Sequence, residues 1–234
     1  MPDLFHRGKD QTARRLAEID SVVVIGLGRF GRSLASELVR CGTEVLGIDA
    51  DEKVVQEMSS RLTHCVRADS TDEDALRQLA VQEFDRAVVG IGTNIEASLL
   101  TASLLRTMGV GNIWAKAISE AHGRILEQLG IEHVVSPEHE MGRRVAHLVK
   151  GRMLDFIQFD DDFALVKMYP PKPIRGLPLG KSGVRSKHRI TVVGVKSPGK
   201  PFTYATAETV VSDHDLIIVS GTTGDIEKFA ALTG

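Results

Sequence analysis

A glycine-rich turn near the beginning of the sequence constrains the fold more than any other feature. Residues 22–33 read VVVIGLGRFGRS, in which Gly26, Gly28 and Gly31 follow a β-branched run and precede an amphipathic stretch. A GxGxxG spacing between a strand and a helix allows a tight turn, a close backbone approach to an anion and close packing of the helix on the strand. The segment therefore predicts a strand–turn–helix unit whose helix N-terminus faces a phosphate group.

The sequence beyond the turn alternates between short β-branched runs and longer amphipathic stretches. The runs predict six strands, at residues 22–25, 44–48, 64–68, 86–91, 113–117 and 133–135. Alternating strands and helices are typical of a parallel sheet with helices on both faces. We therefore expect an α/β, Rossmann-like doubly wound sheet with a crevice at the carboxyl ends of its strands.

Helical periodicity is visible between these strands. Leu34, Leu38 and Val39 share one face of the helix after the first strand. The helix after the fourth strand has a corresponding face, formed by Leu99, Leu100, Ser103, Leu104 and Met108. A further helix is predicted from Pro137 to about Arg152, because proline suits the first helical position and the glutamates of its first turn complement the helix dipole.

The composition changes after this last helix. Strand-like runs recur at 156–159, 164–168, 190–195 and 216–219, with a Pro- and Gly-rich stretch at 169–183. They predict a second, smaller α+β domain. The expected organisation has four parts: a polar arm at 1–20, the Rossmann-like domain at 21–136, a connecting helix at 137–152 and the small domain at 153–234.

Charge and cysteine content exclude several classes of function. Lys and Arg number 29 against 31 Asp and Glu, a formal net charge of −2, whereas nucleic-acid-binding domains usually carry a basic surplus. Cys41 and Cys65 are too few for a disulfide framework and lack zinc-ligand spacing, which indicates a reducing cytoplasm. No apolar run approaches the ~20 residues of a membrane span. We expect a soluble protein that does not bind nucleic acid.

Charged residues near the glycine-rich turn specify its ligand further. Asp49 ends the second strand about 20 residues after the turn, where a carboxylate can accept hydrogen bonds from ribose hydroxyls and would repel a 2′-phosphate. The combination predicts an adenine-nucleotide site and argues against NADP. Arg29 falls in the first helical turn, where a cation is disfavoured unless an anion is near. It suits the terminal phosphates of ATP or ADP, although a solvent-facing position would also explain it.

Other strand ends point to the same crevice. Asp69 follows the third strand and could meet the adenine or ribose, and Lys116 ends the fifth strand and could add a positive charge. Thr93 and Asn94 follow the fourth strand, where they are explained equally well as helix caps alone or as caps that also contact a ligand.

Groups suited to catalysis are scarce. Tyr169 and Tyr204 are the only tyrosines and neither has a YxxxK spacing, while the eight histidines form no HExxH pair. No GxSxG motif is present. The acidic run at 160–162 is better explained as a solvated turn than as a cation site. These observations predict a protein that is not an enzyme.

Longer segments resemble the RCK (regulator of K⁺ conductance) proteins, and among them the cytosolic KtrA/TrkA-type subunits of bacterial potassium uptake systems. The similar segments span nearly the whole chain: VIGLGRFGRSLASEL, EVLGIDADEKVV, GIGTNIEASLLTASLL, NIWAKA, LGIEHVVSPEHEMG and DLIIVSGTTGDIEKF. The resemblance implies an RCK_N half followed by an RCK_C half. It further implies homodimers that assemble into an octameric ring on the inner face of the membrane, beneath a KtrB/TrkH-like potassium channel subunit, which nucleotide binding regulates.

The resemblance also implies roles for individual residues. Arg29 would contact the terminal phosphates, Asp49 would hold the ribose, and Lys116 would lie near the phosphates. Glu138, in the PE-x-x-MG motif, would accompany Mg²⁺ or another cation beside the γ-phosphate at the dimer interface. The complete set of residues expected at the nucleotide is Gly26, Gly28, Arg29, Phe30, Gly31, Asp49, Ala50, Asp69, Ser70, Gly92, Thr93, Asn94, Lys116 and Glu138.

The RCK_C half of many such proteins binds cyclic di-AMP, and the resemblance implies a second site here. The residues expected at it are Ile174, Leu179, Val184, Arg185, His188 and Ile190. Arg185 could equally be a surface residue. One segment departs from the family pattern, because residues 205–208 read ATAE and lack the proline common there.

Two other functions are compatible with the turn. An NAD(H)-binding redox sensor or a small NAD-dependent oxidoreductase would also use a Rossmann-like domain. The oxidoreductase would need an active site for which the sequence offers no candidates, whereas Lys116 and Glu138 favour a triphosphate with a cation. The regulatory subunit that binds ATP or ADP is therefore the leading hypothesis.

Overall fold

The computed structural model describes residues 21–150, 152–159 and 162–232. The arm expected at 1–20 and two residues of the acidic run at 160–162 lie outside this part of the chain. The chain divides into two compact units between Pro137 and Glu138, and each unit is described separately.

The first unit alternates between strand and helix throughout. Its elements are β1 (Ser21–Ile25), α2 (Arg29–Arg40), β2 (Glu44–Asp49), α3 (Glu52–Met58), β3 (His64–Arg67), α4 (Glu73–Gln78), η1 (Val81–Glu83), β4 (Arg86–Val89), α5 (Ile95–Thr107), β5 (Asn112–Lys116), α6 (Glu120–Gln128) and β6 (His133–Val135). All strand pairs are parallel, and the order in the sheet is β3-β2-β1-β4-β5-β6. The Rossmann-like fold is confirmed, and the order reverses between β1 and β4, where such sheets bind ligands.

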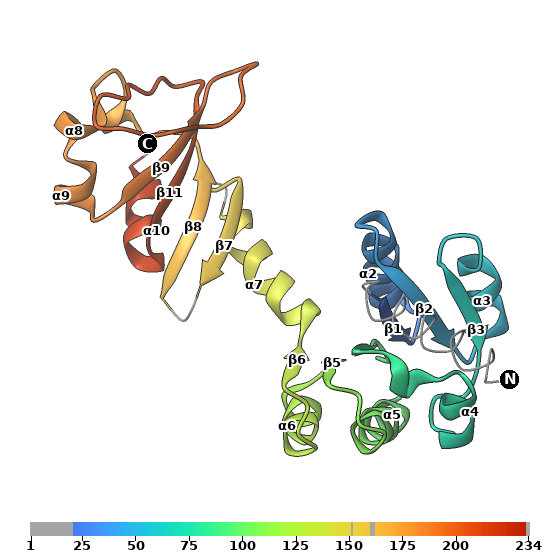
Figure 1. Cartoon of the computed structure of the whole chain (residues 1–234). Coiled ribbons are helices and arrows are strands. Elements are labelled where there is room, and N and C mark those ends of the chain that lie inside the picture. The colour runs from blue at the N-terminus through green and yellow to red at the C-terminus, as the bar shows by residue number, and fades with distance from the viewer. Residues whose placement is uncertain (1–20, 151, 160–161, 233–234) are drawn as a thin grey trace, which may run out of the picture. The chain divides into compact units, whose positions relative to one another are not determined.

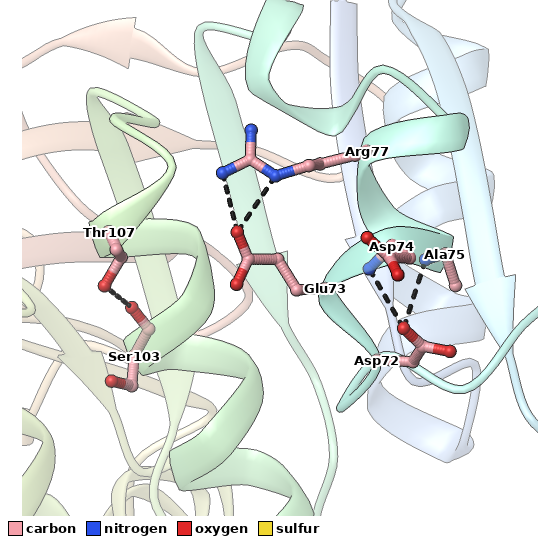
Figure 2. Close-up of polar contacts among 7 residues, drawn as sticks. All are labelled: Asp72, Glu73, Asp74, Ala75, Arg77, Ser103 and Thr107. Carbon is pink, nitrogen blue, oxygen red and sulfur yellow. Dashed lines mark hydrogen bonds and ion pairs between the residues drawn. The ribbon is translucent and has the colours of Figure 1, made fainter.

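Each face of this sheet has its own hydrophobic core. Helices α2 and α3 cover one face, and α4, α5 and α6 cover the other (Figure 1). Leu34, Leu38 and Val39 pack together in the α2 side of the core, as their spacing predicts. Polar side chains cap helices α3 to α6, as at α4, where the Asp72 carboxylate accepts hydrogen bonds from the amides of Asp74 and Ala75 (Figure 2).

The face predicted for α5 is wrong in part. Its buried residues are Ser98, Thr101, Ala102 and Leu105, whereas Leu100 is 48% exposed. The helix carries apolar side chains on most sides, so periodicity alone does not single out the face that packs on the sheet. The Thr101 hydroxyl forms a hydrogen bond with that of Ser70 at 2.8 Å, which offsets the cost of placing small polar residues inside.

The second unit is a small α+β domain. Its elements are α7 (Pro137–Val149, which begins one residue before the division), β7 (Asp155–Phe159), β8 (Phe163–Met168), η2 (Lys172–Ile174), α8 (Leu179–Ser182), α9 (Val184–His188), β9 (Thr191–Lys196), β10 (Thr203–Tyr204), β11 (Leu216–Thr222) and α10 (Thr223–Ala231). The strands form one antiparallel sheet in the order β10-β9-β11-β8-β7 (Figure 1). Its core contains Ile226 and Phe229 of α10, and Leu148 of α7 packs against it.

Three details of this unit differ from the sequence-based expectation. Helix α7 ends at Val149 and not near Arg152. The Pro- and Gly-rich stretch contains η2 and α8, and α8 stops at Gly183, whose φ of 72° is the left-handed conformation that glycine adopts without strain. The two-residue strand β10 is too short to produce a recognisable pattern. Among the described residues, no helix combines the length and apolar character needed to cross a membrane.

Candidate functional site

The glycine-rich turn has the geometry that its spacing predicts. Gly26 has a φ of 88°, and a Cβ atom there would lie 2.8 Å from the Ile91 side chain. A Cβ atom on Gly31 would lie 2.0 Å from the carbonyl oxygen of Gly26, so helix α2 approaches the turn as closely as backbone atoms allow. Gly28 differs from both, because a Cβ atom there would have no neighbour within 4 Å.

Gly28 leaves the beginning of α2 open. It is the N-cap residue of the helix and, lacking a side chain, forms no side-chain cap. The first amides of a helix have no partner within the helix and carry a partial positive charge. No acidic side chain occupies the first turn of α2, and exposed Arg29 lies in that turn. This arrangement suits an anion such as a phosphate group.

The carboxylate of Asp49 is held in place by backbone amides. Its Oδ2 accepts a hydrogen bond of 2.6 Å from the amide of Leu27, and its Oδ1 accepts one of 2.9 Å from the amide of Asp51. The first bond joins the end of β2 to the glycine-rich turn. The carboxylate therefore has a fixed position beside the turn, with lone pairs left for further donors such as ribose hydroxyls.

A cavity of about 270 Å³ brings most of the expected residues together. The expected residues that line it are Gly26, Gly28, Asp49, Ala50, Asp69, Ser70, Gly92, Thr93 and Asn94. Sequence reasoning missed the apolar part of the lining, which consists of Ile25, Ile48, Ala68, Gly90, Ile91 and Ala97. All of these residues except Ala97 lie within two residues of a strand end, so the strand boundaries were the signal that could have found them.

The polar residues of the lining are also tied to local structure. Asp69 Oδ1 accepts hydrogen bonds from the hydroxyl (2.7 Å) and the amide (2.9 Å) of Thr71, and these bonds lower the pKa of the Asp69 carboxyl. Asn94 Oδ1 accepts from the amide of Ala97 at 3.1 Å and caps α5. Asn94 therefore both caps a helix and lines the cavity, and Thr93 lines it beside Asn94.

Some expected residues do not line this cavity: Arg29, Phe30, Gly31 and Lys116. Lys116 lies close by, since its Nζ would be 3.4 Å from a Cβ atom on Gly92. Its side chain is 8% exposed, and its ammonium lies over the Phe30 ring, 5.7 Å from the ring centroid, within the range of a cation–π interaction. Phe30 therefore contacts the lysine.

Glu138 belongs to the second unit, so its approach to the nucleotide remains a prediction. Within the described part of the chain, no three His, Cys, Asp or Glu side chains come together as a metal site.

The second unit has a larger cavity of about 670 Å³, between the α8–α9 segment and strand β9. Four of the residues expected at the second site line it: Leu179, Val184, Arg185 and Ile190. Ile174 is instead fully buried in the core, and His188 lies against the ring of Phe229 at 5.4 Å. The lining that sequence reasoning missed consists of Gly180, Gly183, Ser186, Thr191, Val192, Ala205, Thr206 and Ala207.

The segment that departs from the family pattern belongs to this second lining. The amide of Gly180 donates to the carbonyl of Ala207 at 2.8 Å, and a Cβ atom on Gly180 would lie 3.1 Å from that of Ala207. The close approach of two backbones explains the glycine at 180, and residues 205–207 of the changed segment line the cavity.

The fold defines the class of protein: a Rossmann-like domain with an uncapped helix N-terminus at its glycine-rich turn, followed by a small α+β domain. The TrkA-N domain model matches residues 22–137. The chain is 37% identical over 207 residues to the Ktr system potassium uptake protein C of Bacillus subtilis (strain 168), covering 88% of this chain and 94% of that protein. It is 30% identical over 199 residues to the Ktr system potassium uptake protein A of Vibrio alginolyticus, covering 85% and 90%. The chain belongs to the family of the Ktr system potassium uptake proteins.

Solved structures show the same fold. The RCK domain of GsuK superposes with a TM-score of 0.63 at 19% identity, covering 92% of this chain and 48% of that longer chain. A structure described as the GsuK channel bound to NAD has the same TM-score and identity. At this level of identity the likeness establishes the architecture.

Proposed function

We propose that the chain is a regulatory subunit of a potassium uptake system and that ATP or ADP, bound in the first unit, controls it. Its relatives support the role in potassium transport, since proteins 37% and 34% identical to it are Ktr system potassium uptake proteins. The subunit acts by binding. Its regulation is then a difference in nucleotide affinity between two states of its assembly.

One observation carries the ligand assignment. The cavity joins a fixed carboxylate, Asp49, to the open N-terminus of α2 at Gly28. Its volume of about 270 Å³ is near the lower end of the roughly 300–1,000 Å³ of small-molecule pockets. The adenosine part would fill the cavity, with the ribose at Asp49. The phosphates would extend over the first turn of α2 towards Arg29, and Lys116 would stand near them.

We further propose how the subunit is assembled and where it works. Homodimers would form an octameric ring on the cytoplasmic side of the membrane, attached to a KtrB/TrkH-like subunit. Glu138 and a cation such as Mg²⁺ would complete the site around the γ-phosphate. A cation between a carboxylate and phosphate oxygens offsets their mutual repulsion, which provides a physical reason for ATP and ADP to favour different states.

Thermal unfolding with ATP, ADP and NADH, each with and without Mg²⁺, tests the assignment. A ligand at about 100 times its Kd stabilises the folded state by roughly 2.7 kcal/mol. We expect ATP and ADP to raise the unfolding temperature, with a Mg²⁺ effect for ATP. A rise with NADH alone would replace the proposal with the redox-sensor alternative.

The second cavity supports a second ligand, cyclic di-AMP. Four of the residues expected from the family line it, and Arg185 provides a cation for a phosphate. Calorimetric titration should show binding that Arg185→Ala abolishes. Lys172→Ala is the matched control, because Lys172 is an exposed cation of the same unit that does not line the cavity. Equal loss in both variants, or none in either, would contradict the assignment.

A further inference from the structure

An ion pair between helices α2 and α3 also contacts the backbone of the glycine-rich turn. The Nη1 atom of Arg32 in α2 lies 2.6 Å from Oε2 of Glu57 in α3. The Nε atom of the same guanidinium donates a 2.8 Å hydrogen bond to the carbonyl oxygen of Leu27. One planar group thus contacts a carboxylate and a backbone carbonyl at once.

Leu27 is held on both sides of its α-carbon. Its amide donates to Asp49, its carbonyl accepts from Arg32, and its side chain is fully buried. A residue fixed at these three places cannot rotate about either backbone bond without breaking a contact. The conformation of the turn therefore depends on Arg32 as well as on the glycines.

The carbonyl that accepts from Arg32 belongs to the peptide unit between Leu27 and Gly28. A trans peptide is planar, and its N–H points opposite to its C=O. No peptide bond of the described chain is cis. By orienting the carbonyl of Leu27, the guanidinium therefore also orients the amide of Gly28. Gly28 is the N-cap residue of α2 and lines the cavity.

We propose that Arg32, held by Glu57, is a positioning residue for phosphate recognition. It fixes the direction of the Gly28 amide and so prepares the turn for an anionic phosphate, while it does not itself line the cavity. The inference rests on the proposed nucleotide site and adds to it a pair of residues that do not line the cavity. The planar fork of arginine can satisfy both partners together, whereas lysine offers one point charge.

The positioning role is tested by measuring how much the phosphate groups of a nucleotide contribute to its binding affinity. Titration calorimetry is carried out with adenosine, AMP and ADP on the wild-type protein and on Arg32→Met, Arg32→Lys and Arg77→Met. Arg77 is the matched control, because it forms a similar exposed pair with Glu73 within α4, away from the turn (Figure 2).

Arg32→Met should weaken ADP by about three- to tenfold, the equivalent of one net hydrogen bond. Adenosine should change by less than about twofold, on the same scale. Arg32→Lys should fall between wild type and Arg32→Met, and Arg77→Met should behave as wild type. Equal losses for adenosine and ADP, or no loss in Arg32→Met, would overturn the positioning role.

Hydrogen exchange of the ligand-free protein provides a readout that does not depend on the nucleotide. Amides of residues 26–30 should exchange faster in Arg32→Met than in wild type, and at the wild-type rate in Arg77→Met. Unchanged exchange in Arg32→Met would refute the proposed control of the turn. If wild type binds no adenine nucleotide while exchange changes as expected, the proposed function fails and the role in phosphate recognition fails with it, but the control of the turn stands.

Discussion

Two glycines of the turn provide a test in which the same substitution has opposite consequences. A Cβ atom on Gly31 would lie 2.0 Å from the backbone oxygen of Gly26, far inside van der Waals contact, and that oxygen cannot move without displacing the turn. A Cβ atom on Gly28 would meet no atom within 4 Å, and its φ of −66° and ψ of −167° are accessible to alanine.

The expected magnitudes follow from these distances. Gly31→Ala gains about 1 kcal/mol of helix propensity, but the overlap costs about 1–3 kcal/mol or more, and the contact with a backbone atom places it at or above the upper end. We expect the free energy of unfolding to fall by about 2 kcal/mol. Gly28→Ala should lower the free energy of unfolding by less than about 1 kcal/mol, since its only cost is the replacement of a favourable N-cap residue by a poor one.

The affinity of the folded protein for ADP should rank the two variants in the opposite order, with the larger loss in Gly28→Ala. The methyl group of Gly28→Ala would occupy the space over the first turn of α2, so ADP affinity should fall by at least about tenfold, or 1.4 kcal/mol. Urea unfolding of each variant gives its stability, and calorimetry gives its ADP affinity. Equal destabilisation by both changes, or wild-type ADP affinity in Gly28→Ala, would refute the assignment of these two roles.

Three further predictions concern other parts of the first unit. Asp49→Asn should weaken ADP binding by about 1.5–3 kcal/mol in a calorimetric titration. Its effect should not add to that of replacing ADP with 2′-deoxy-ADP; full additivity would show that the ribose does not contact this carboxylate. Burial lowers the pKa of His122, so the folded protein favours the neutral ring. The contribution of this group to the free energy of unfolding should be fully present above the unfolded pKa of about 6.5 and should decline as the pH falls towards the lowered folded pKa. Urea midpoints between pH 7.5 and 5.5 should show this decline in wild type and a smaller one in His122→Asn; identical slopes would exclude His122 as the cause. Phe30→Leu and Lys116→Met should show a coupling of about 0.5–2 kcal/mol in a double-mutant stability cycle, the strength of a cation–π contact; additive effects would mean that the ring does not stabilise the ammonium.

The sequence predicted those features that depend on local backbone requirements. Gly26 adopts a positive φ and Gly31 tolerates no Cβ atom, so the motif determines the turn directly. Asp49 was found because a strand end fixes where its carboxylate lies. The strands β1, β2 and β4 were recognised from buried apolar runs, each of which has its own pattern.

Features that depend on contacts between distant segments were not predicted. The buried face of α5 includes Thr101, whose hydroxyl forms a hydrogen bond with that of Ser70, and no helical period reveals this contact. The role of Arg32 requires knowing that its guanidinium reaches Leu27 and Glu57 together. The wall formed by residues 205–207 faces the second cavity only because the chain returns beside Gly180.

The most direct test of the central claim is a calorimetric titration of the wild-type protein and Asp49→Asn with ADP and ATP. We expect one nucleotide per chain in wild type, with affinity that falls about tenfold or more in the variant, because the variant loses a charged hydrogen-bond acceptor. Absence of binding by both nucleotides, or equal affinity in the two proteins, would contradict a nucleotide-controlled site at the end of β2.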